Sequence, residues 1–266
     1  MKKITVFLLS LLSLTAFGQT YFQDIGDADY KSLMKNGLTY IQSGDKVLDS
    51  MIEIGLENYW KVSPYKIIDA DGTIKEDDVI MTLLEGTKLV IVSVKALKRS
   101  EISIYKTTAV ADIDGFKSMV SEHMFHLLPY LINAFSDMAE KMNINKIEKR
   151  GLPYFNKMNE LYLPSSKVLK DKTLLILTGA IQGPDVNKEE LTKAGIKFEH
   201  VTFDQFREIE SREAEDYCLL YLNSEMFSDI TIFNVSDKSI AYTRHYIKNV
   251  PKLDKEDIKL IVSSWK

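Results

Sequence analysis

The sequence predicts an α/β fold (α+β) made of two β-α-β-α-β-β halves with mixed sheets, joined by a long amphipathic helical segment. Three observations support this fold. Strand-like and helix-like segments alternate along residues 38–109, the same order recurs along residues 173–246, and apolar side chains recur at helical spacing through residues 114–143. A β-α-β crossover makes its strands parallel, whereas a terminal hairpin adds antiparallel neighbours. The pattern leaves open whether the halves share one sheet.

The N-terminus has the layout of a secretory signal peptide, residues 1–18. Two lysines precede a nearly unbroken apolar run over residues 4–14, and Ala16 and Gly18 place small residues at positions −3 and −1 of a cleavage site. The run is too short to span a bilayer. We therefore expect cleavage between Gly18 and Gln19 and export to the periplasm or beyond. No transmembrane segment is expected in the mature chain, and no cysteine follows the run to carry a lipid anchor.

The first half, residues 19–113, is predicted to contain four strands and two helices. Residues 88–94 form the apolar, β-branched run that is typical of a buried strand. We expect a helix over 74–86 that starts with a capping box formed by Thr73 and Glu76. The predicted strands are 38–42, 65–68, 88–94 and 101–109, and the predicted helices are 46–60 and 74–86.

Residues 114–166 are predicted to form a helical connector between the halves. Its apolar stripe consists of Phe116, Val120, Met124, Leu127, Leu131, Phe135, Met138 and Met142. Such a stripe is typical of a packing face rather than a cofactor site. Pro129 should bend the helix or split it in two. Charged residues follow the apolar ones too closely for a membrane span.

The second half, residues 167–266, repeats the order of the first and adds one strand and a C-terminal helix. Nearly equal distances separate Thr73 from Lys88 and Thr202 from Asp216, which indicates an internal duplication. The predicted strands are 173–179, 196–201, 217–222, 229–235 and 239–247, and the predicted helices are 187–195, 203–213 and 254–265.

Composition narrows the class of partner. The chain has 266 residues and a formal net charge of −4, and 45% of its residues are hydrophobic. It can therefore bury one large core or two modest ones. An acidic balance argues against a nucleic-acid surface or an anionic-membrane surface. Cys218 is the single cysteine, so no intramolecular disulfide can form, and its apolar neighbours predict a small buried hydrophobe rather than a reactive thiol.

The acidic segment KIIDADGTIKEDD, residues 66–78, has two interpretations. A calcium-binding loop would place Gly72 at its sixth position. Its carboxylate ligands would be Asp69, Asp71 and Asp78. Its first position would be Ile67, which has no side-chain oxygen, and its twelfth would be an aspartate in place of the usual glutamate. The alternative is an Asp-Gly turn before a capped helix. We favour the turn, because a capping box recurs at Thr202 without an acidic loop.

Histidines of the connector raise the question of a metal. Glu122, His123 and His126 lie on the side of the helix away from its apolar stripe. Two histidines three residues apart can share a metal, but a site needs a third protein ligand. Only folding could bring in His200 or His245. We favour a solvated pair with a contact between Glu122 and His126.

Aromatic side chains gather near the ends of elements: Tyr59, Trp60, Tyr65, Tyr154 and Phe155. They either line a ligand groove or seal the interface between helices and sheet, and we favour the seal. The sequence contains no G-x-S-x-G, P-loop, dinucleotide fingerprint or H-E-x-x-H. It therefore assigns no catalytic, cofactor-binding or metal-binding residue, and no cofactor is predicted.

In the order of their elements, residues 38–109 and 173–246 each resemble the periplasmic α/β domains of the TolB N-terminal and curli-secretion assembly-factor type. The resemblance implies a role in envelope assembly through partner binding. It carries over no functional residue. This chain differs from those domains in its duplication, its long central helix and the absence of a lipid anchor.

These observations lead to three hypotheses. We expect an exported, non-catalytic protein of a diderm bacterium that binds an unknown envelope protein or small ligand between its two halves. One alternative is a periplasmic hydrolase whose site assembles only in three dimensions. It predicts two carboxylates, or a histidine and a carboxylate, within hydrogen-bond reach in a pocket. The other is a calcium-dependent adhesion or carbohydrate-binding module.

Overall fold

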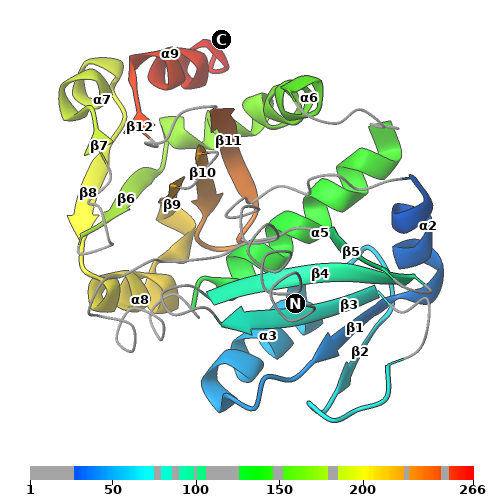
Figure 1. Cartoon of the computed structure of the whole chain (residues 1–266). Helices are drawn as coiled ribbons and strands as arrows, with labels where there is room; N and C mark the ends of the chain where they lie inside the picture. The colour runs from blue at the N-terminus through cyan, green and yellow to red at the C-terminus, as the bar shows by residue number, and fades with distance from the viewer. Residues whose placement is uncertain are drawn as a thin grey trace, which may run out of the picture.

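The computed structural model describes residues 27–74, 79–85, 90–98, 101–105, 126–145, 152–178, 185–224, 228–246 and 252–266. These residues form two five-stranded sheets with helices between and around them (Figure 1). Each sheet has parallel and antiparallel neighbours, so the predicted α/β class with mixed sheets is confirmed. Several predictions fall outside the described residues: the signal peptide (1–18), residues 75–78, residues 114–125 with Glu122 and His123, and the side chains of Tyr154, Phe155 and His245.

The first sheet consists of β1 (Leu38–Ile41), β2 (Tyr65–Ile68), β3 (Val79–Glu85), β4 (Val90–Lys98) and β5 (Glu101–Tyr105). Its strand order is β2-β1-β3-β4-β5. Strand β1 runs parallel to both of its neighbours, and β3, β4 and β5 follow each other antiparallel. Helix α2 (Asp27–Asn36) precedes β1, and helix α3 (Lys46–Tyr59) connects β1 to β2.

The second sheet consists of β6 (Thr173–Leu177), β8 (Phe198–Val201), β9 (Tyr217–Ser224), β10 (Ser228–Asn234) and β11 (Ile240–Tyr246), in the order β11-β10-β9-β6-β8. Its connections are β7 (Asp185–Val186), α7 (Lys188–Ala194), α8 (Phe203–Arg212) and η3 (Ala214–Asp216). Strand β6 is parallel to β8 and β9, and β9, β10 and β11 are antiparallel. The two sheets thus share one strand order and one pattern of directions, and their origin by duplication stays a prediction.

The helix predicted over residues 74–86 is wrong, because residues 79–85 form strand β3. Val79, Ile80 and Met81 are all buried, and a short run that is buried on both faces has no periodicity to separate strand from helix. Pairing with β1 and β4 decided the outcome. Strand β3 occupies the place in the first sheet that β9 occupies in the second. The nearly equal distances from Thr73 to Lys88 and from Thr202 to Asp216 end at β4 and β9, which are not corresponding strands.

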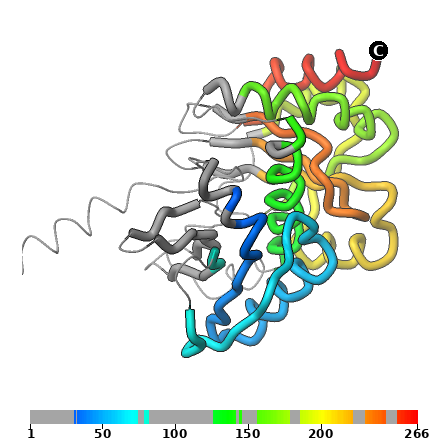
Figure 2. Tube along the Cα trace, turned by 90° about the vertical axis from the view of Figure 1, so that its right-hand side faces the viewer, coloured from blue at the N-terminus to red at the C-terminus, as the bar shows by residue number. Residues whose placement is uncertain are grey.

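A layer of helices lies between the two sheets. It contains α3 and α5 (Leu128–Asn145), which pack against each other, whereas α6 (Leu152–Tyr162) packs against β11 at the edge of the second sheet. Figures 1 and 2 show α5, in green, between the first half and the strands of the second sheet. Pro129 stands in the first turn of α5, where proline is tolerated. The predicted stripe is buried at Leu127, Leu131, Phe135 and Met138, as a packing face requires.

Two apolar cores hold the fold together. The first joins α3, α5 and the first sheet to one face of the second sheet, and includes Leu38, Ile52, Phe135, Leu219 and Phe233. The second lies on the other face of the second sheet, under α7, η2 (Leu163–Lys170) and α9 (Lys255–Ser263). Strand β12 (Lys252–Leu253) precedes α9 and pairs in parallel with β7. Ile258 and Ile261 of α9 are buried in this core, which confirms that the C-terminal helix docks on the body.

Candidate functional site

Four of the largest fully buried side chains in the described part of the chain are tyrosines, and each donates a hydrogen bond to a carboxylate. The pairs are Tyr40–Asp49 (2.6 Å), Tyr130–Glu210 (2.7 Å), Tyr162–Asp137 (2.5 Å) and Tyr242–Asp257 (2.7 Å). Each pair joins two different elements. None of the four pairs is predicted from the sequence, because the partners lie 9 to 80 residues apart on different elements and no local pattern marks them.

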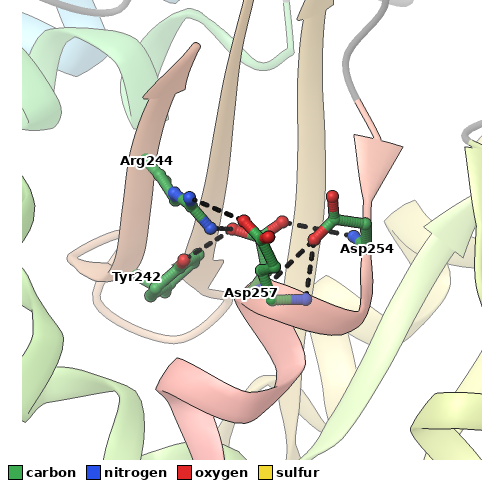
Figure 3. A network of polar contacts seen from close by, with 5 residues as sticks. Tyr242, Arg244, Asp254 and Asp257 are labelled. Atoms are coloured by element: carbon green, nitrogen blue, oxygen red, sulfur yellow. Dashed lines mark hydrogen bonds and ion pairs between the residues drawn. The ribbon is translucent and has the colours of Figure 1, made fainter.

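The Asp257 network attaches α9 to the edge strand of the second sheet (Figure 3). The carboxylate of Asp257 is fully buried and accepts from Tyr242 Oη and, at 3.2 Å, from Arg244 Nη1. Its second oxygen accepts from the backbone N–H of Asp254, the N-cap of the helix, at 3.2 Å. Because a buried carboxylate is costly unless it is paired and hydrogen-bonded, these contacts fix the position of α9 on the sheet.

The Asp49 network closes the loop between β1 and α3. The carboxylate is 7% exposed and accepts from Tyr40 Oη, from the N–H and hydroxyl of Ser43 (2.8 and 2.9 Å) and from the N–H of Gly44 (3.0 Å). Burial by itself would raise the pKa of Asp49, but these hydrogen bonds outweigh burial and hold the pKa below its usual value. The network therefore favours a charged carboxylate and a fixed loop.

Three further contacts hold α3 in place. Asp45 caps its N-terminus by accepting from the N–H groups of Val47 and Leu48. A Cβ at Gly55 would collide with the Cδ1 of Ile132, so the glycine permits close approach of α3 to α5. Beyond the end of the helix, the N–H of Lys61 donates to Ser136 Oγ of α5 at 2.8 Å. Helix α3 is thus anchored at both ends and along its inner face.

The outer face of this anchored helix carries an apolar stripe. Val47 is 44% exposed and Ile54 is 39% exposed, and Met51 between them is half-buried, with part of its side chain packed against the first core. Steps of four and three residues place the three side chains in one line along the helix. Lys46, Ser50 and Glu57 around them are exposed. We call the three apolar residues Val47, Met51 and Ile54 the α3 stripe. An apolar strip with a polar rim on a rigid helix is typical of a protein-docking site.

Within the acidic segment, residues 69–72 form a turn. Asp69 and Asp71 are exposed, and the N–H of Gly72 donates to the carbonyl oxygen of Asp69 at 2.9 Å. Asp78 lies outside the described residues. Within the described ranges, no three side chains of histidine, cysteine, aspartate or glutamate come together in a way that could hold a metal ion.

The described histidines and aromatic residues that the sequence singles out lie on several elements. His126 lies against the ring of Phe203, whereas His200 stands on β8 beside Phe198. Burial, and then the charge of Lys188, lower the pKa of His200. Trp60 is buried, Tyr59 is half-buried and Tyr65 is exposed.

The single cysteine matches its prediction. Cys218 is buried on β9, where burial raises the pKa of its thiol to about 12. A thiol in that state is unreactive at neutral pH. The prediction of a small buried hydrophobe is therefore confirmed.

Comparison with known proteins does not identify a family. No family model and no solved structure matches the chain. A stretch of 132 residues is 26% identical to cell division control protein 3 of Saccharomyces cerevisiae, and covers 45% of this chain and 24% of that protein. The chain therefore spans about a quarter of the length of this relative. In the part of the chain that the structure describes, no helix is both long enough and apolar enough to cross a membrane.

Proposed function

We propose that this protein is an exported binding protein of the cell envelope and that its partner is another protein, which docks on the α3 stripe. The observation that carries the proposal is the exposure of Val47 and Ile54 on a helix that Asp49, Gly55 and Asp45 hold rigidly. A fixed apolar strip binds with little loss of conformational freedom.

The packing between the halves favours a protein partner over a small ligand held there. Described residues of both halves form one continuous core in that region, and Tyr40, Leu56 and Phe233 within it are buried. The carboxylates of the four tyrosine pairs are engaged in joining elements, which favours binding over the hydrolase alternative.

Site-specific photo-cross-linking in the native host tests the proposal. A benzophenone amino acid at position 54 should give a cross-link to one defined protein. The same amino acid at Leu260, which is 38% exposed on α9, is the matched control and should not give that product. Once the partner is identified, Ile54→Glu should weaken its binding to the purified protein by at least about tenfold, because it places a charge in the apolar contact.

Two outcomes would contradict the proposal. One is an identical cross-linking pattern from positions 54 and 260. The other is cell fractionation that leaves the untagged full chain in the cytoplasm, which would remove the envelope from the proposal even if a partner binds.

A further inference from the structure

The turn between β10 and β11, residues 235–239, reaches across to the helical layer. Asn133 Nδ2 of α5 donates to the carbonyl oxygen of Asp237 at 3.1 Å, and Tyr130 Oη lies 3.4 Å from the carbonyl oxygen of Val235. These two contacts link a hairpin of the second sheet to a helix that packs on the first half. The turn therefore stands at the junction between the halves.

Lys238 connects this turn to three helices. Its ammonium group lies 2.9 Å from Glu210 Oε1 of α8, 4.6 Å from the ring centre of Tyr130 and 5.7 Å from that of Tyr59. The side chains of Lys238 and Glu210 are 14% and 25% exposed, so water screens the ion pair only in part. One carboxylate and two aromatic faces, from three different helices, are the groups that recognise an alkylammonium ion.

The backbone of Lys238 adopts a conformation that is unfavourable for a residue with a side chain. Its φ of 59° makes it the single non-glycine residue with a positive φ among the described residues. A side chain with a Cβ is disfavoured in this left-handed conformation, which glycine and asparagine adopt more readily. The conformation persists because the surrounding contacts hold it, and strain of this kind accumulates at switching segments.

We propose that Lys238 is a releasable lock between the second sheet and the helical layer, and that Tyr59, Tyr130 and Glu210 form an ammonium receptor which it occupies. When the ammonium group leaves, the turn relaxes its backbone and separates from α5. The vacated receptor then accepts an alkylammonium group from outside, such as a free amine. This proposal is independent of docking on the α3 stripe.

Two substitutions separate the charge from the strain. Lys238→Gly removes the ammonium group and the strain together, whereas Lys238→Met removes the charge and keeps the Cβ in its left-handed conformation. In hydrogen exchange on the full chain, amides of residues 235–239 and of α8 should exchange about tenfold faster in Lys238→Gly, and faster still in Lys238→Met. Amides of α7 and α9, on the far face of the second sheet, should be unchanged. Lys157→Met, which breaks an exposed ion pair on α6, is the control and should change none of them.

Chemical rescue tests the receptor. The n-butylammonium ion reproduces the side chain that Lys238→Gly lacks, so at tens of millimolar it should restore slow exchange in the turn. It should fail in the double variant Lys238→Gly, Glu210→Gln. Rescue that is equal in both variants, or absent from the first, overturns the receptor. A uniform rise of exchange across both cores, or no rise in either Lys238 variant, overturns the lock.

Discussion

The helix that follows the first strand is attached differently in the two halves, although the sheets share one strand order. In the first half, the fourth residue after the N-cap of α3 is Asp49, whose buried carboxylate ties the helix back to β1 and the loop. In the second half, the fourth residue after the N-cap of α7 is Leu191, which is buried in the second core. The helix after the first strand is thus attached by a hydrogen-bonded carboxylate in the first half and by a buried apolar side chain in the second.

The two helices therefore leave different surfaces exposed. Leu191 attaches α7 through its inner face, and α7 ends after seven residues at Gly195 in a left-handed cap. Helix α3 has 14 residues and is anchored by polar contacts at its start, which leaves an apolar stripe free on its outer side. We infer that the first half carries the binding surface and that the second half supplies the better-covered scaffold.

The largest effect is expected from Leu191→Asp. A carboxylate at this position would be buried in an apolar core without the donors that surround Asp49, so the free energy of unfolding should fall by about 4–5 kcal/mol. Urea denaturation measures the loss, and Leu191→Met, which keeps the volume, should cost less than about 1.5 kcal/mol. A loss below that of the methionine variant would mean that the two helix attachments are interchangeable.

Asp49→Leu is the reverse exchange and should cost about 3 kcal/mol, because it leaves Tyr40 Oη and the loop N–H groups without an acceptor. The same urea titration at neutral pH checks this value. Adding Tyr40→Phe to the variant should recover part of the loss, since one buried donor disappears. If the double variant is less stable than the single one, the Tyr40 hydroxyl is not a partner of Asp49.

The Asp49 network should also depend on pH. The pKa of Asp49 is lower in the folded protein than its usual value of 3.8, so its stabilisation is present above pH 3.8 and is lost as the pH falls through the folded pKa. The stability difference between the wild type and Asp49→Asn should therefore shrink as the pH falls below 3.8. Thermal unfolding at pH 7, 4 and 3 measures it, and a constant difference would contradict the assignment.

Gly55→Ala should cost about 2 kcal/mol, because its Cβ meets Ile132 across the contact between α3 and α5. Ile132→Val removes the Cδ1 that the new Cβ would strike, so the double variant should regain most of the loss relative to Ile132→Val alone. Denaturation of the four proteins forms a double-mutant cycle. Additive costs would show that the helices do not approach each other through this pair.

The smallest effect compares two threonines. Thr202 caps α8 in a complete capping box with Gln205, so Thr202→Ala should cost about 1 kcal/mol. Thr73 is exposed, and the helix it was expected to cap is replaced over residues 79–85 by β3. Thr73→Ala should therefore cost less than about 0.5 kcal/mol. An equal loss for both threonines in the same thermal melts would indicate a cap at Thr73 after all.

Local chemistry in the sequence was enough to predict much of this protein. The capping box at Thr202, the packing stripe through Leu131 and Met138, the burial of Cys218 and the docking of the C-terminal helix all follow from patterns within one element, and all are confirmed. Periodicity and capping are short-range properties, so a single segment is sufficient to reveal them.

Tertiary structure decided what depends on partners far apart in the chain. Residues 79–85 became a strand because β1 and β4 pair with them, and the two halves kept separate sheets because α3 and α5 fill the space between. The tyrosine–carboxylate pairs and the contacts of Lys238 join side chains that lie between 9 residues (Tyr40 and Asp49) and 179 residues (Tyr59 and Lys238) apart in the chain. The exposed face of α3 likewise depends on which elements pack against the rest of the helix. A side chain's own sequence neighbours carry no information about such a partner, so only the packed fold determines which polar groups meet and which apolar face stays exposed.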